Sequence, residues 1–136
     1  MVWQNELTLP PFRRGIHPVT QEIIARLPAL PETGLLHLYL RHTSAALMIS
    51  ENADPAVQGD ISRFLDYLFP ENHPLYLHEE EGPDDMPAHL KSALTGISLT
   101  LPITGHRLNL GTWQGIFLCE FRNAARGRSL VATITG

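Results

Sequence analysis

The chain has 136 residues, 43% of them hydrophobic and 18% charged, a balance typical of one compact globular domain and not of a disordered segment. The net charge of −4 and the lack of a broad basic face argue against a nucleic-acid partner. No apolar run reaches the roughly 20 residues that cross a bilayer, and the start lacks the regions of a signal peptide. We therefore expect a cytoplasmic protein without a membrane partner. The single cysteine, Cys119, excludes an internal disulfide and a thiolate zinc site, so any metal needs histidine and carboxylate ligands.

The first half of the chain predicts β segments around one short helix. Alternation of apolar and polar residues over 3–9 indicates a strand. Residues 20–30 are typical of a short helix with Thr20 as its N-cap. The β signal over 34–52 predicts either two strands or one long strand broken near 43–44.

The second half begins with two helices and ends in strands. Asp54–Pro55 suits the start of a helix that continues to about Phe69, and a loop then covers 70–83. A further helix should begin at Asp84–Asp85 and end before Gly96. β signals follow at 97–103, 107–110, 114–122 and 129–135. The sequence therefore predicts a single α+β domain over 1–136, with a largely antiparallel sheet or sandwich and two or three helices.

The segment HEEEGPDDMPAH (78–89) holds five carboxylates and two histidines. On a helix that begins near residue 85, Asp85 and His89 share one face, and Gly82 lets His78 fold back toward them. Imidazoles beside a carboxylate suit a divalent cation such as zinc, manganese or iron. The spacing matches no standard zinc motif, however, and taken alone it favours a solvated acidic loop in which Asp84 or Asp85 caps the helix.

Polar residues also gather in HTSAALMISENADP (42–55). His42 continues the apolar phase of the preceding strand, which is as consistent with a core histidine as with a functional one. Ser44 is a poor candidate for a hydrolase nucleophile, because neighbours in a strand face opposite sides and no Gly-x-Ser-x-Gly elbow is present.

Glu120 shares a face with two aliphatic residues of a probable central strand, where an unpaired carboxylate is costly. It therefore needs a histidine, a lysine, a metal or solvent, and is a site candidate. Trp113 and Gln114 lie between two glycines, where a loop presents them to a ligand or packs the indole as core. Cys119, in phase with two phenylalanines, is interpreted as a buried small hydrophobe.

The cations allow two interpretations. Lys91 is by default a solvated surface lysine, although it could meet a phosphate over the preceding helix N-terminus. Arg122, Arg126 and Arg128 could hold a small anion, but a flexible basic turn is the favoured interpretation.

Three segments, in this order, resemble the YjbQ family, also called UPF0047: HTSAALMISENADP, HEEEGPDDMPAHLKSAL and LNLGTWQGIFLCEFR. The resemblance spans nearly the whole chain. It implies a small α+β protein that forms homotrimers and carries a secondary thiamine-phosphate synthase activity. That reaction joins a hydroxymethylpyrimidine diphosphate to a thiazole phosphate.

With the resemblance, a functional site in the acidic segment 78–89 is favoured over a solvated loop. Together with the residue patterns, the resemblance predicts a role for each candidate. We expect a divalent metal ion (zinc, magnesium or manganese) at His78, His89 and Asp85, with Asp84 as the other choice of acid. Catalytic roles are expected for His42, Glu120 and Lys91, and contacts to a small phosphorylated substrate for Thr43, Ser44, Asn52, Trp113 and Gln114. The same residues fit a metal-dependent hydrolase or another transferase, or a non-catalytic trimer that binds a metal or ligand.

Overall fold

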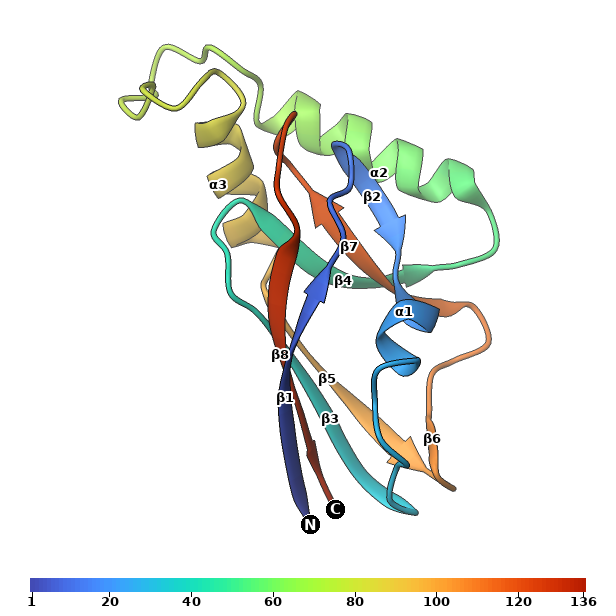
Figure 1. Cartoon of the computed structure of the whole chain (residues 1–136). Helices are drawn as coiled ribbons and strands as arrows, with labels where there is room; N and C mark the ends of the chain where they lie inside the picture. The colour runs from blue at the N-terminus through green and yellow to red at the C-terminus, as the bar shows by residue number, and fades with distance from the viewer.

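The computed structural model describes all 136 residues and arranges them as two antiparallel sheets with three helices (Figure 1). In chain order the elements are β1 (Val2–Leu9), β2 (Gly15–Pro18), α1 (Thr20–Ile24), β3 (Thr33–Leu40), β4 (Ala45–Glu51), α2 (Pro55–Leu68), α3 (Asp85–Thr95), β5 (Ser98–Thr104), β6 (Arg107–Leu108), β7 (Gln114–Glu120) and β8 (Arg128–Thr135). One sheet has the order β1-β8-β3-β5-β6 and the other β2-β7-β4. The predicted α+β fold with antiparallel sheets is confirmed.

The main core lies between the two sheets and is built by the period-two alternation of their strands. Leu36, Leu38 and Leu40 of β3 are fully buried in it, as are Ile116 and Leu118 of β7. Because successive side chains along a strand point to opposite faces, one face of each sheet packs into this core.

A second, smaller core lies between the three-stranded sheet and the two longer helices. It contains Leu65 of α2, Ala88 of α3, Cys119 of β7, and Phe121, which directly follows that strand. Strand β7 is therefore covered on both faces, which explains why its sequence is apolar almost without interruption. In Figure 1, α2 and α3 lie at one end of the molecule, and the two termini meet at the other.

The helix starts follow from their sequences. Asp54 caps α2, because its Oδ1 accepts the N–H of Ala56 at 2.9 Å, and Pro55 occupies the first turn as predicted. Asp84 occupies the N-cap position of α3 but makes no side-chain cap hydrogen bond. Its carboxylate instead accepts hydrogen bonds from Arg122 and from the N–H of Asn123, which belong to the candidate site described below.

The predicted helix over 20–30 is wrong in length and in its cap. Helix α1 has only five residues and begins after Val19, while the Thr20 hydroxyl accepts the N–H of Ile116 at 2.8 Å. Thr20 therefore ties the helix to the sheet and does not cap it. Strand β2, which pairs with β7, was not predicted, because four residues are too few to show an alternation.

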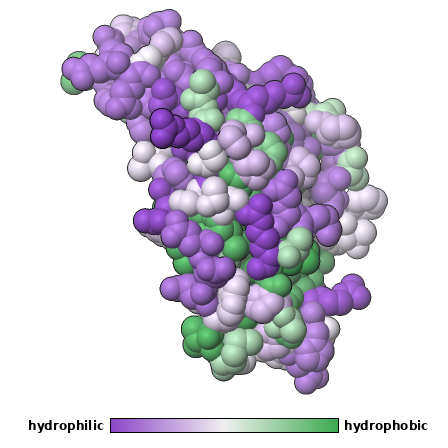
Figure 2. All heavy atoms as spheres, viewed as in Figure 1, coloured by the Kyte–Doolittle hydropathy of each residue, from purple (hydrophilic) through white to green (hydrophobic).

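The long β signal over 34–52 is two strands, as one of the alternatives proposed, and they belong to different sheets. No helix is long and apolar enough to cross a membrane. The face in Figure 2 is mostly hydrophilic over α2 and the 70–83 loop, and hydrophobic surface gathers toward the other end.

Candidate metal centre

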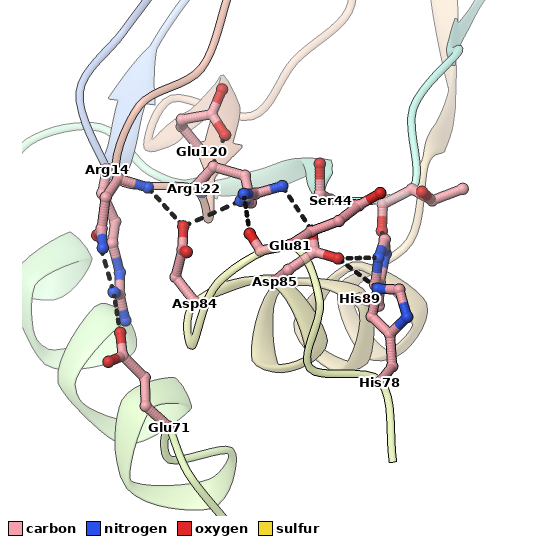
Figure 3. Close-up of polar contacts among 12 residues, drawn as sticks. Arg14, Ser44, Glu71, His78, Glu81, Asp84, Asp85, His89, Glu120 and Arg122 are labelled. Carbon is pink, nitrogen blue, oxygen red and sulfur yellow. Dashed lines mark hydrogen bonds and ion pairs between the residues drawn. The ribbon is translucent and has the colours of Figure 1, made fainter. Parts of the chain in front are cut away.

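The structure brings His78, Asp85 and His89 together at the N-terminal end of α3 (Figure 3). Oδ2 of Asp85 lies 2.6 Å from Nε2 of His78 and 3.0 Å from Nε2 of His89. The three potential ligand atoms all lie within 4.8 Å of one another. Asp85 and His89 meet across one helical turn, and Gly82, with φ of 104°, provides the bend that returns His78. The predicted convergence of these residues is present.

The second nitrogen of His89 fixes the protonation pattern of its ring. Nδ1 lies 2.7 Å from the carbonyl oxygen of Thr43, and a carbonyl only accepts, so Nδ1 carries the hydrogen. In the neutral ring Nε2 then presents a lone pair toward a carboxylate oxygen. That contact is repulsive unless His89 is protonated or a cation lies between the two atoms. A backbone carbonyl on the far nitrogen is the usual partner of a metal-binding histidine.

Asp85 is almost completely buried, with 1% of its side chain exposed. Its other oxygen, Oδ1, accepts a hydrogen bond from Nη1 of Arg122 at 2.6 Å. Burial alone would raise the pKa of Asp85, but the hydrogen bond from His78 and the charges of His89 and Arg122 outweigh it and lower that pKa. The buried carboxylate is therefore kept ionised.

Arg122 also holds the neighbouring acid. Its Nε donates to Oδ2 of Asp84 at 2.9 Å, and its Nη2 donates to the carbonyl of Glu81 at 2.9 Å. The N–H of Asn123 donates to the same Asp84 oxygen at 2.9 Å. Burial would raise the pKa of Asp84, but these hydrogen bonds and the Arg122 charge lower it. Of the two aspartates, Asp85 faces the histidines and Asp84 faces the arginine.

Both histidines can be reached from the surface. The side chain of His78 is 44% exposed and lines a hollow of about 390 Å³ with Tyr76 and Met86. His89 is 29% exposed and lines a second hollow, of about 300 Å³, with His42 and Thr43. The cluster combines a buried anion with two accessible imidazoles, which is an arrangement open to an ion and a ligand.

His42 acts as a hydrogen-bond acceptor toward the sheet. Its Nε2 accepts the N–H of Ser129 at 2.8 Å, so the neutral ring carries its hydrogen on Nδ1. Burial, together with the positive charge of Arg128, lowers the pKa of His42. His42 is therefore a neutral ring beside the hollow with one free N–H donor, and its Nε2 is not available as a base.

Glu120 is fully buried and its partner is an arginine, which the sequence analysis did not consider. Nε and Nη2 of Arg128 donate to its two oxygens at 2.7 and 2.5 Å, and the N–H of Arg122 donates at 3.2 Å. Arg128 also donates to Oγ of Ser44 at 3.1 Å. The carboxylate of Glu120 and the hydroxyl of Ser44 are thus committed to a buried ion pair, which does not support catalysis by Glu120.

Lys91 is not a surface lysine. Its side chain is 2% exposed, and Nζ lies 2.5 Å from Oδ1 of Asp66 and 5.7 Å from the ring centre of Phe121. It joins α3 to α2 and does not face a phosphate. The basic turn was also a wrong interpretation, because Arg122 and Arg128 are held in ion pairs and only Arg126 is free.

The remaining candidates lie at the other end of the same strands. Ala45 of β4 pairs with Glu120, whereas Glu51 pairs with Gln114 six residues further along, so about 20 Å separates the two ends. Trp113 is 64% exposed there. Nδ2 of Asn52 donates to the backbone carbonyl of Gln114, and Oε1 of Gln114 accepts the N–H of Gly111, so both side chains hold the turn in place. Within one chain, Asn52, Trp113 and Gln114 do not join the histidine cluster.

Comparison with known proteins agrees with this fold. The family model described as UPF0047 protein YjbQ-like matches residues 5–136. The chain belongs to this family. The UPF0047 protein YjbQ of Salmonella typhimurium is 49% identical over 138 residues, which cover all of this chain and 99% of that protein. The resemblance to the YjbQ family is confirmed.

Solved structures show the same YjbQ-like architecture. A conserved hypothetical protein from Thermus thermophilus has a TM-score of 0.82 and 38% identity, covering 93% of this chain and 97% of its own. A hypothetical protein from Aeropyrum pernix has a TM-score of 0.82 and 30% identity, covering 98% of each chain.

Proposed function

We propose that this YjbQ-family protein binds a divalent transition-metal ion through His78, Asp85 and His89 and uses it on a small phosphorylated molecule. One observation carries the metal proposal: Nε2 of His78 and Nε2 of His89 converge on the same oxygen of the buried Asp85 carboxylate, at 2.6 and 3.0 Å. A cation placed among these three atoms would be bound by two imidazole nitrogens and one carboxylate oxygen. The carbonyl of Thr43 on Nδ1 of His89 leaves Nε2 of that ring as the nitrogen available to the metal.

The ligand set limits which ion fits. Two imidazole nitrogens and one carboxylate oxygen suit zinc, manganese or iron(II), whereas magnesium prefers oxygen ligands and retained waters. Ligand atoms around a tetrahedral zinc lie about 3.3 Å apart, so an ion needs only a modest spreading of the two contacts to Asp85. Three protein ligands leave a coordination position for water or substrate, as in catalytic sites.

The reaction class we favour is transfer or hydrolysis at a phosphorylated small molecule. Thiamine-phosphate formation is the specific case that the family resemblance suggests. There the thiazole nitrogen bonds to the methylene carbon of the pyrimidine, the carbon–oxygen bond to diphosphate breaks, and diphosphate leaves. The metal would supply positive charge to the departing diphosphate.

The chain's own residues assist in limited ways. His42 offers its Nδ1–H, and the exposed Thr43 offers a hydroxyl beside the same hollow. Glu120 and Lys91 are omitted from this chemistry, since Glu120 is held in a buried ion pair with Arg128 and the buried Lys91 is paired with Asp66.

A homotrimer in the cytoplasm remains part of the proposal, on the strength of the family resemblance. The rival to an enzyme is a trimer that holds the metal without turnover. The separation of Trp113 and Gln114 from the cluster is compatible with either.

Metal analysis of the purified protein after equilibration with zinc tests the binding site. We expect about one zinc per chain in the wild type and a loss of stoichiometric zinc in His78→Ala and in His89→Ala. His37→Ala, on strand β3 outside the cluster, is the matched control and should keep its zinc. Equal zinc content in all four proteins would sink the proposed site.

Assays of thiamine-phosphate formation and of phosphate-ester hydrolysis on the zinc-loaded protein separate an enzyme from a binder. An enzyme should lose turnover in His89→Ala and keep it in His37→Ala. Saturable zinc binding with no turnover of either substrate class would leave the binder as the function.

A further inference from the structure

The geometry points to Arg122 as the positioning residue of this centre: it fixes which oxygen of Asp85 faces the metal and holds the loop that carries His78. This inference rests on the proposed metal site. The guanidinium of Arg122 contacts three residues of the segment 81–85, namely Glu81, Asp84 and Asp85, as Figure 3 shows.

The first observation concerns the orientation of Asp85. Nη1 of Arg122 lies 2.6 Å from Oδ1, while Oδ2 is the oxygen shared by the two imidazoles. A carboxylate free to rotate offers either oxygen, or both together. With Oδ1 occupied by a charged donor, Asp85 presents one oxygen in one direction.

The second observation concerns His78, which lies in a loop and not on a helix or strand. Between His78 and α3 the same guanidinium binds the carbonyl of Glu81 and the carboxylate of Asp84. The N–H of Asn123 adds a further hydrogen bond to Asp84. The return of His78 toward His89 is therefore fastened at two points to the residues that follow β7.

The third observation is that Arg122 is itself anchored. Its N–H donates to Oε2 of Glu120, which is fully buried against Arg128, and its neighbour Phe121 is buried in the second core. The side chain of Arg122 is 25% exposed. A fixed base and three donors on three acceptors give a rigid fork, which a lysine does not reproduce.

This arrangement has a consequence for metal selectivity. By holding Asp85 to one oxygen, Arg122 keeps the donor set at two nitrogens and one oxygen and disfavours ions that require many oxygens. Removal of Arg122 should weaken zinc binding and change the coordination geometry, even though Arg122 does not touch the metal.

Zinc affinity, measured by competition with a chromophoric chelator, tests the inference in the full-length protein. We expect Arg122→Gln to weaken binding about 10–100-fold, the effect typical of lost outer-shell partners. Arg122→Lys keeps the charge without the fork and should also bind more weakly than the wild type. Arg126→Gln removes an exposed arginine four residues away and should match the wild type.

The visible spectrum of the cobalt-substituted protein is the second measurement, because it reports coordination geometry and not stability. A changed spectrum is expected for Arg122→Gln and an unchanged one for Arg126→Gln. Asp84→Asn, which weakens only the loop attachment, should lose less affinity than Arg122→Gln. Circular dichroism establishes whether each variant is folded. If Arg122→Gln is unfolded, the zinc affinity and cobalt spectrum of Arg122→Lys test the positioning role in its place.

The outcomes separate this inference from the function it rests on. If the wild type binds zinc and folded Arg122 variants bind it within twofold with the same cobalt spectrum, the positioning role is wrong and the metal site stands. If the wild type and Arg126→Gln bind no zinc, both proposals are wrong.

Discussion

Replacing Glu120 by glutamine should destabilise the fold strongly, although the shape of the side chain is conserved. Glu120 has no exposed surface and accepts three N–H groups, two of them from Arg128, which is itself buried. An amide cannot neutralise Arg128, and its NH₂ group faces donors. Removing one partner of a buried ion pair costs about 3–5 kcal/mol.

Urea unfolding measures this loss directly, because the denaturation midpoint falls while the slope stays constant. A loss of about 3–5 kcal/mol is a large part of the roughly 7–20 kcal/mol expected for a chain of this length. Glu79→Gln, in the exposed loop, is the matched control and should change stability by less than about 0.5 kcal/mol. If Glu120→Gln unfolds within about 1 kcal/mol of the wild type but abolishes turnover, the structural assignment is refuted and a catalytic Glu120 is restored.

Three further outcomes follow from the same contacts. Because the folded-state pKa of Asp84 is lowered below 3.8, the ionised carboxylate stabilises the fold above pH about 4, and this stabilisation is lost as the pH falls through the lowered pKa. Asp84→Asn should therefore be less stable than the wild type near neutral pH, and its urea midpoint should depend less on pH in the acid range. An unchanged acid dependence would contradict this role of Asp84. Burial raises the pKa of Cys119 to about 12, so a thiol reagent should label no cysteine in the native protein and one after unfolding, whereas rapid native labelling would show that this strand opens. Lys91→Met should preserve zinc affinity, since Lys91 pairs with Asp66 and not with the cluster; a loss of zinc from a folded variant would place Lys91 back in the site.

Local spacing identified the ligand cluster as a possibility, although it favoured a solvated loop until the resemblance to the YjbQ family was added. Asp85 and His89 are four residues apart on a helix whose start the sequence marks, and Gly82 supplies the bend for His78. The strands other than β2 were likewise predicted from their β patterns, and helix α2 from its Asp54–Pro55 start. These features depend on backbone periodicity and capping, which act over a few residues.

What surrounds the cluster depends on contacts between distant segments. Arg122 is 37 residues from Asp85, and Arg128 meets Ser44 across 84 residues, so no spacing rule connects them. A signal for Glu120 was present, because a carboxylate in the apolar phase of a central strand requires a partner. The sequence did not indicate that Arg128, eight residues along the chain in the other sheet, is that partner.

The environment of Lys91 also depends on residues far away in the sequence. A lysine on a helix is by default solvated, yet Nζ of Lys91 lies beside Asp66 of α2 and the ring of Phe121, and only 2% of its side chain is exposed. Only the packing of α3 against α2 determines that environment. Thr20 similarly suits an N-cap by its type, but a backbone N–H of β7 competes for its hydroxyl.

Anomalous diffraction from zinc-soaked crystals tests the metal proposal most directly. The account predicts one strong peak per chain, about 2.0–2.2 Å from Nε2 of His78, Nε2 of His89 and one oxygen of Asp85, with Oδ1 of Asp85 still bound to Arg122. A structure that holds zinc elsewhere, or leaves both imidazoles hydrogen-bonded directly to Asp85 in excess zinc, would contradict it.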